Sequence, residues 1–166
     1  MAITVEDGTI VAGANSYASV ADLRDYADDR GISLPSSDSA CEILLIKAAD
    51  YVESKRDKYQ GIKAESDQPM QWPRDGAYVD GFEVSASEIP RELKYAQMQL
   101  ACDAHTTDIM PNRLVATQGA VTRQKVGDLE VAYANPTNPL SVPAFAKADA
   151  LLAPLYKRNG LMGVRV

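Results

Sequence analysis

The clearest hydrophobic pattern in the chain lies between residues 87 and 106, where apolar residues recur at helical spacing. A helix is predicted there, with Ser87 as its cap and Pro90 in the first turn, where a missing N–H group does least harm. One apolar stripe consists of Ile89, Leu93, Ala96, Leu100 and Ala104. A second stripe, on the opposite face, consists of Tyr95, Met98 and Cys102. A surface helix needs only one apolar stripe, so the second predicts either a central place in a bundle or a contact with another subunit.

Three further helices are predicted from the same periodicity. The first runs from a Ser19 cap to about residue 30. The second starts at a Ser39–Glu42 capping box and runs to about residue 55. The last starts near Pro143 and is kinked or ended by Pro154. The expected core positions are Val20, Leu23 and Ala27 in the first, Cys41, Leu45, Ala48 and Val52 in the second, and Phe145, Ala148, Leu152 and Leu155 in the last.

Two β-hairpins are predicted from apolar–polar alternation around turn residues. The first spans residues 3–11 around Asp7-Gly8, and the second spans residues 121–133 around Gly127-Asp128. Residues 59–86 are predicted as a long loop, which Trp72 anchors on the helices. The alternative for Trp72 is an aromatic platform for nucleic-acid bases.

Together these elements predict a mainly α fold, a small bundle of about four helices with a β-hairpin and extended N- and C-terminal arms. A length of 166 residues suits one domain with arms. We expect a helical domain over residues 1–134, with the N-terminal hairpin in 1–14 and the second hairpin at 121–133. Residues 135–166 are expected to form a proline-containing linker, the C-terminal helix and a docking tail.

Composition changes the functional expectation. The net charge of −6 and the sequence pI near 4.8 argue against a grip on DNA by the whole surface, which leaves room only for a local basic patch. Cys41 and Cys102 are expected to be buried free thiols. The N-terminus lacks the basic and apolar regions of a signal peptide, and no apolar stretch approaches the length of a membrane span. We therefore expect a soluble protein made in a reducing cytoplasm.

No residue pattern in the sequence predicts catalysis. The single histidine, His105, supports no nucleophile–base arrangement. The glycines lack the spacing of a phosphate-binding loop, and the cysteines and histidine lack the spacing of a zinc site. We expect no enzymatic activity, no metal and no cofactor.

An ordered set of short motifs runs through nearly the whole chain. They are Glu6-Asp7-Gly8, Ala14-Asn15-Ser16-Tyr17, Asp29-Arg30-Gly31, Ala48-Ala49-Asp50-Tyr51, Trp72-Pro73-Arg74, Glu88-Ile89-Pro90, Leu93-Lys94 with Ala96, Leu100-Ala101, Lys125-Val126-Gly127, Glu130-Val131 with Tyr133, and Ala150-Leu151-Leu152-Ala153-Pro154-Leu155. In order and spacing, this set resembles the small head–tail connector proteins of long-tailed bacteriophages. The relevant branch is often labelled DnaT-like single-stranded DNA-binding protein.

The resemblance implies a structural virion protein of the neck, made in the cytoplasm of the bacterial host. Such connectors form a homo-oligomeric ring, usually of twelve copies, under the portal protein. The ring extends the channel through which the genomic DNA passes, and it docks the next neck or tail-terminator protein; no membrane is involved.

Site residues follow from this hypothesis. The expected portal-docking residues are Leu155, Tyr156, Lys157, Arg158, Leu161, Met162 and Val164. The expected subunit contacts are Tyr95, Met98 and Cys102. The candidates for contact with DNA are Arg123 and Lys125 on the second hairpin.

Two alternatives stay open. The first is a single-stranded DNA-binding module, supported by Arg123 and Lys125 and by Trp72 with Arg74. Such modules normally combine a basic groove with several stacking aromatic side chains. The second is a small helical protein with another assembly role, such as a tail-completion or scaffold-like factor.

Overall fold

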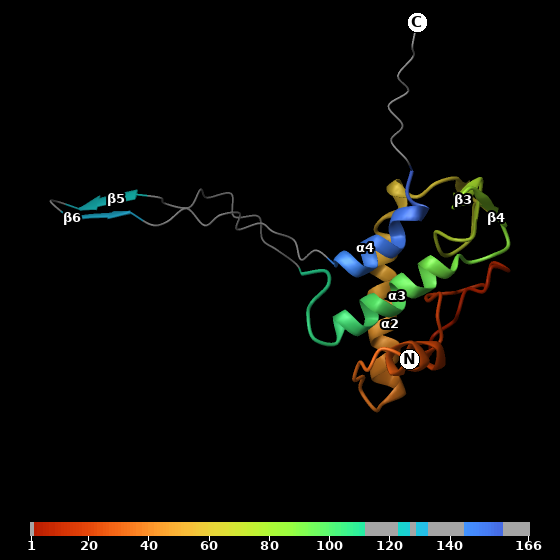
Figure 1. Cartoon of the computed structure of the whole chain (residues 1–166), viewed down its shortest axis with the longest axis horizontal. Helices are drawn as coiled ribbons and strands as arrows, with labels where there is room; N and C mark the ends of the chain where they lie inside the picture. Colours follow the sequence, from red (N-terminus) through yellow and green to blue (C-terminus); the bar gives the residue numbers. More distant parts are fainter. Residues whose placement is uncertain (1, 112–122, 127–128, 133–144, 158–166) are drawn as a thin grey trace, which may run out of the picture. The chain divides into compact units, whose positions relative to one another are not determined.

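The computed structural model describes residues 2–111, 123–126, 129–132 and 145–157 (Figure 1). The chain forms two compact units. Unit 1 comprises Met1–Ile109 together with Phe145–Val166, and unit 2 comprises Met110–Ala144.

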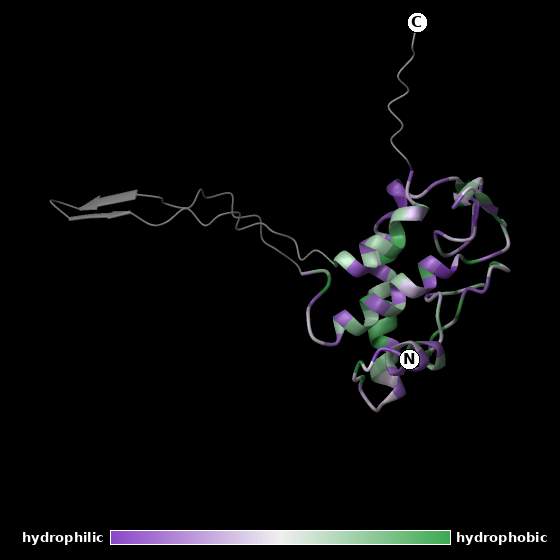
Figure 2. Cartoon of the chain, viewed as in Figure 1, coloured by the Kyte–Doolittle hydropathy of each residue, from purple (hydrophilic) through white to green (hydrophobic). Residues whose placement is uncertain are grey.

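Four α-helices lie in the described part of unit 1, and they confirm the predicted mainly α bundle. They are α1 (Val20–Asp28), α2 (Asp38–Glu53), α3 (Arg91–Ala104) and α4 (Ala146–Leu152), with two short 3₁₀ turns, η1 (Arg56–Lys58) and η2 (Ala153–Leu155). Helix α3 contacts each of the other three helices, and it crosses α2 in the middle of the unit (Figure 1). Figure 2 shows strongly apolar colouring on α2 near this crossing.

Helix α1 begins as predicted, and α2 does not. Ser19 accepts a hydrogen bond from the N–H group of Asp22, whose carboxylate accepts from the N–H group of Ser19, so the two residues form a capping box. The predicted Ser39–Glu42 box at the start of α2 is wrong. Arg24 binds the Asp38 carboxylate at 2.7 Å, and the chain is already helical from Asp38.

Helix α3 begins four residues later than the predicted Ser87 cap. Ser87 lies instead in a turn, and its own carbonyl oxygen packs against Gly8. Gly8 has a φ of +109°, and a Cβ atom there would stand 2.2 Å from that oxygen. The contact requires glycine and holds Ser87 outside the helix.

The second apolar face of α3 is explained by its central position. Met98 and Cys102 are buried inside unit 1, and Tyr95 is 36 % exposed. Helix α1 packs on this side of α3, with the Tyr26 ring 5.5 Å from the Tyr95 ring in an edge-to-face contact. Met98 and Cys102 are therefore too buried to form the broad subunit contact that was predicted for this face.

Two short antiparallel ribbons occupy the segment that was predicted as a loop. They pair β1 (Ile62–Lys63) with β2 (Arg74–Asp75), and β3 (Ala77–Val79) with β4 (Phe82–Val84). Strands of two or three residues are too short to show alternation in a sequence. The Trp72 side chain is fully buried, with its ring 5.7 Å from the Tyr59 ring, which confirms its predicted role as an anchor.

The predicted N-terminal hairpin is wrong. Residues 4–16 form a loop that a parallel bridge between Val5 and Ser16 closes. The buried Glu6 carboxylate accepts hydrogen bonds of 2.9 Å from the N–H groups of Gly8, Ile10 and Val11. Those backbone donors are occupied by a side chain, so they do not pair across a hairpin.

The second predicted hairpin is present. Strand β5 (Arg123–Val126) pairs with β6 (Leu129–Ala132) in an antiparallel register that places Lys125 opposite Glu130. This ribbon belongs to unit 2, whereas α4 belongs to unit 1 and packs on α3. The predicted apolar face of the last helix is buried against the bundle of unit 1. Its buried members are Phe145, Ala148, Leu152 and Leu155.

A fully buried glutamine connects α3 to two other segments. The Gln97 Oε1 atom accepts from the N–H group of Tyr17 at 2.8 Å. Its Nε2 atom donates to the Ser16 hydroxyl at 2.8 Å and to the Leu45 carbonyl at 2.9 Å. One side chain therefore fixes both the segment before α1 and the middle of α2.

A buried phenol extends this network to the end of α2. The Tyr17 hydroxyl donates to the Glu53 carboxylate and accepts from the N–H group of Trp72 at 3.1 Å. Glu53 also accepts from the N–H group of Gln71 at 3.0 Å. Burial raises the pKa of the Glu53 carboxyl above its ordinary value, and burial together with the neighbouring Glu53 charge raises that of Tyr17.

Replacing Gln97 by leucine is expected to lower the free energy of unfolding by roughly 2–4 kcal/mol, because it leaves buried polar groups unpaired. Urea denaturation would measure the loss. Gln99→Leu on the same helix is the matched control, since the partners of Gln99 are the side chains of Tyr26 and Asp103, which can reorient. Equal losses for both variants would contradict the special place of Gln97.

Glu53→Gln is expected to change how stability depends on pH. The folded pKa of Glu53 is raised, so its contribution is most favourable below the unfolded value and is lost as the pH rises through the folded value. The glutamine variant has no such titration and still offers an acceptor to Tyr17. The stability of the wild type relative to the variant should therefore decrease in urea denaturation as the pH rises from the ordinary carboxyl value of 4.5 through the raised folded value. An increase over that interval would mean that the ionised carboxylate stabilises the fold.

Candidate functional site

Four cationic residues gather where two distant segments of unit 1 lie side by side. An antiparallel bridge joins Tyr59 to Tyr156, and the N–H group of Lys157 donates to the Lys58 carbonyl at 2.7 Å. The chain around η1 and the chain after η2 are thereby held together. The cationic residues, here called the basic end, are Lys55, Arg56, Lys58 and Lys157.

Aromatic rings lie directly beneath the basic end. The Lys55 ammonium is 4.1 Å from the centre of the Tyr51 ring, and the Lys58 ammonium is 5.7 Å from that of Tyr156. The Tyr156 ring lies 5.7 Å from the Tyr59 ring. Burial raises the pKa of Tyr156 to about 12, so this phenol is neutral at physiological pH. Tyr156 therefore adds no negative charge beneath the cations, whereas Asp57 pairs with Arg56 at 3.8 Å and the Asp149 charge adds to the rise in the pKa of Tyr156.

Gln60 ties the β3–β4 ribbon to the basic end. Its Nε2 atom donates to the Pro154 carbonyl at 2.7 Å and to the Tyr78 carbonyl at 3.1 Å, and its Oε1 atom accepts from the N–H group of Tyr78 at 3.2 Å. The ribbon exposes Tyr78 by 48 % and Phe82 by 79 %. Cationic and aromatic side chains therefore share one end of unit 1.

The Trp72-Pro73-Arg74 motif supports this end from inside. The Arg74 guanidinium donates to the Gln60 carbonyl at 2.7 Å and to the Gly61 carbonyl at 2.8 Å, and burial lowers its pKa. Trp72 is fully buried and cannot stack on a base. The proposed role of Trp72 and Arg74 in contacting DNA is therefore wrong, and both residues position the chain.

A second feature is a hollow between α1 and α3. It has a volume of about 200 Å³. The lining residues of this acidic hollow are Asp22, Asp25, Tyr26, Asp29, Arg30, Tyr95 and Met98. The Arg30 guanidinium lies 3.6 Å from the centre of the Tyr26 ring and donates to the Tyr26 carbonyl. Aspartates dominate the charge of the rim.

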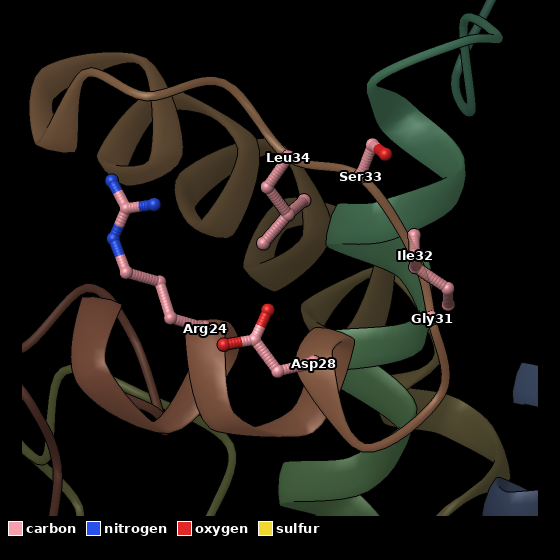
Figure 3. A pocket seen from close by; sticks show the side chains of 6 residues that line it. All are labelled: Arg24, Asp28, Gly31, Ile32, Ser33 and Leu34. Atoms are coloured by element: carbon pink, nitrogen blue, oxygen red, sulfur yellow. The ribbon is translucent and has the colours of Figure 1, made fainter.

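A larger and more open pocket of about 460 Å³ lies between α1 and the loop that follows it. Figure 3 shows Arg24 and Asp28 projecting from α1 toward the side on which Leu34 lies. The Arg24 guanidinium is engaged by the Asp38 carboxylate and by the Pro35 and Ser36 carbonyls. Because these groups already bind the Arg24 guanidinium, it is not available to bind a ligand in this pocket.

The structure separates the residues that were predicted to dock on a portal. Leu155 is fully buried and belongs to the core, because the turn η2 packs it inward, so it is not a docking residue. Tyr156 is half-buried and Lys157 is exposed. Arg158, Leu161, Met162 and Val164 lie outside the described residues.

The remaining predictions concern Arg123 and Lys125 in strand β5 of unit 2 and the two cysteines in the core of unit 1. Arg123 and Lys125 lie in β5, as predicted, and Lys125 has an acidic residue opposite it in the register. Both cysteines are free and buried, as predicted. Burial raises the pKa of Cys102 to about 11 and raises that of Cys41, so neither is an activated thiolate.

Sequence reasoning did not find the basic end. Lys55, Arg56 and Lys58 are visible in the sequence only as cations near a helix C-terminus, a common position for them. Their functional interest comes from Lys157, which is about a hundred residues away in the chain and donates to the Asp57 carbonyl at 3.2 Å. No local sequence pattern predicts that contact.

The described ranges hold neither a metal-binding cluster nor a membrane-spanning helix. There, no three His, Cys, Asp or Glu side chains are grouped closely enough to hold a metal ion. None of the helices in those ranges is long and apolar enough to cross a bilayer.

Comparison with known proteins assigns the chain to a family. No curated protein and no solved structure matches it. The model of one family, described as "Putative DnaT-like ssDNA binding protein", matches residues 1–166. This agrees with the label of the branch that the motifs resemble, and the connector role stays a prediction. The chain belongs to the DnaT-like ssDNA-binding family.

Proposed function

We propose that this protein is a structural component of a bacteriophage neck, a head–tail connector whose copies assemble under the portal protein. The proposal follows the resemblance carried by the motifs. Three features of the fold support it.

The motifs that carry the resemblance build an interior. The Glu6 carboxylate accepts hydrogen bonds from backbone N–H groups, and the Tyr17 hydroxyl bonds to Glu53 and to the N–H group of Trp72. The Arg74 guanidinium donates to backbone carbonyls. None of these groups is presented to a substrate. A protein whose work is to offer fixed surfaces to neighbours needs this kind of rigid interior.

The carrying observation is the β5–β6 ribbon. Its two strands have four residues each and belong to unit 2. A two-stranded hairpin alone is barely stable in water. Such a ribbon is stabilised when a further surface covers it, and in an assembled neck a second copy or a partner protein can supply that surface.

Lys157 is the last described residue of the C-terminal segment, and it is exposed. Leu155 fills the core and Tyr156 pairs with Tyr59, so the proposed portal contact begins after them. The revised docking set is Lys157, Arg158, Leu161, Met162 and Val164.

Deleting residues 159–166 is expected to leave the fold intact and to abolish attachment to the portal, because it removes Leu161, Met162 and Val164 but none of the described core. Circular dichroism melting would report on the fold, and co-sedimentation with portal-bearing capsids on attachment. A glycine–serine segment of equal length in place of residues 159–166 controls for chain length and should also fail to attach. Undiminished attachment of either variant would refute the docking set, and failure of the full chain to attach would refute the connector.

A second candidate function is binding of single-stranded DNA, which the family description names. The basic end favours it, since cations beside exposed aromatic side chains are the combination that single strands require. The chain's net charge of −6 restricts such binding to this end.

If this second function holds, a labelled oligothymidine should bind with strong salt dependence. Four neutralised phosphates would give a slope of about −3 in log K against log salt between about 50 and 200 mM. The double variant Lys58→Gln and Lys157→Gln should halve that slope. The matched control is Lys47→Gln with Lys147→Gln, two exposed lysines on α2 and α4. Absence of binding at low salt, or an equal response of both pairs, would exclude binding at the basic end.

A further inference from the structure

We infer that the basic end of one copy of this chain docks in the acidic hollow of a second copy. The inference rests on the proposed connector function and deepens it, because it names the two surfaces through which copies meet.

The acidic hollow suits a lysine side chain. Tyr26, Tyr95 and Met98 line it with aromatic and apolar surface, and aspartates stand around them. A volume of about 200 Å³ is below the usual range for small-molecule pockets, which begins at about 300 Å³. Arg30 already lies 3.6 Å from the centre of the Tyr26 ring, so the apolar stem of an incoming lysine would pack on Tyr95 while its ammonium meets the aspartates, which outnumber Arg30 in the lining.

Several acidic residues of α1 lie at its C-terminal end, where negative charge is unfavourable for the helix. Asp25 and Asp28 lie in its last turn, Asp29 is its C-cap, and no basic residue lies in that turn. All three are exposed. Carboxylates are unfavourable at a helix C-terminus, where cations are preferred. Arg30, which follows the C-cap, donates to the Tyr26 carbonyl at 3.0 Å and offsets one of these charges, and the excess of carboxylate that is left on an exposed surface points to a role for that surface outside the helix.

The two surfaces lie at opposite ends of α2. The Arg24–Asp38 ion pair ties α1 to the first residue of α2, and the basic end follows the last residue of α2. The sixteen residues of α2 span about 24 Å, and Figure 1 shows α1 near one end of this helix and the blue turn that follows α4 near the other. The surfaces therefore cannot meet within one copy.

Pairing of opposite ends between copies is a head-to-tail contact. Such heterologous contacts close into rings or continue as filaments. Because each chain carries a net charge of −6, copies repel one another in general, and only a surface of opposite charge offsets that repulsion.

Neutralising each surface separately tests the inference on the full chain. One variant is Asp25→Asn with Asp29→Asn, and the other is Lys58→Gln with Lys157→Gln. Either variant alone should need roughly tenfold more protein to associate in native mass spectrometry and light scattering at low salt. Controls are Lys47→Gln with Lys147→Gln, and Asp75→Asn with Asp80→Asn, which neutralise exposed charges elsewhere.

Mixing the two variants gives the sharper result. The first keeps a native basic end and the second keeps a native hollow, so an equimolar mixture should form a one-to-one heterodimer that does not grow further. Wild-type assembly by both variants would overturn the inference, and retained portal attachment would then leave the connector function standing. Loss of oligothymidine binding without loss of self-association would also overturn it, and would assign the basic end to nucleic acid. A wild type that is monomeric and does not attach to the portal would overturn both.

Discussion

Three hydrogen bonds of one buried carboxamide determine how unit 1 is put together. Gln97 connects to residues 80, 81 and 52 positions away in the sequence, and every partner is itself buried. In a low-dielectric interior such bonds are strong when made, and the same groups are costly when left unpaired. Apolar contacts alone would hold α2 against α3 in several neighbouring arrangements. The glutamine stabilises the one arrangement in which Ser16, Tyr17 and Leu45 all reach it.

The position of the basic end follows from this interior. Tyr17 fixes Glu53 and Trp72, the Trp72 ring packs on Tyr59, and the Tyr59 hydroxyl donates to the Val52 carbonyl at 3.0 Å. Tyr59 then pairs with Tyr156 and brings the C-terminal segment to the end of α2. The cations of the basic end are flexible side chains, but the backbone that carries them is rigid. A charged surface on a rigid frame loses less conformational entropy when it docks than one on a free arm.

Periodicity predicts what depends on local burial. The core stripe of Cys41, Leu45, Ala48 and Val52 is buried as its spacing indicated, and Ile43 on the opposite side is 48 % exposed. Prediction failed where a polar side chain takes over backbone donors: Asp7-Gly8 looks like a hairpin turn, but Glu6 captures the N–H groups that a hairpin would use. Prediction also failed for the basic end, which depends on a long-range contact, since no sequence pattern near Lys58 predicts that Lys157 lies beside it. Charge counts along the chain could locate Lys55, Arg56 and Lys58, but only the fold shows which residues they face.

Net charge is a weak guide to what this chain binds, and the arrangement of charge is a better one. At physiological ionic strength the Debye length is about 8 Å, so the overall charge of −6 is screened over most of the molecule and short-range contacts decide. A single strand of DNA would satisfy the cations of the basic end but would leave the acidic hollow without an explanation. A second copy satisfies both surfaces with one contact. It also gives a reason for carboxylates at the C-terminal end of α1, where the helix dipole disfavours them. The same chain can therefore be acidic as a whole and carry a cationic end, and the proposed docking between copies accounts for both.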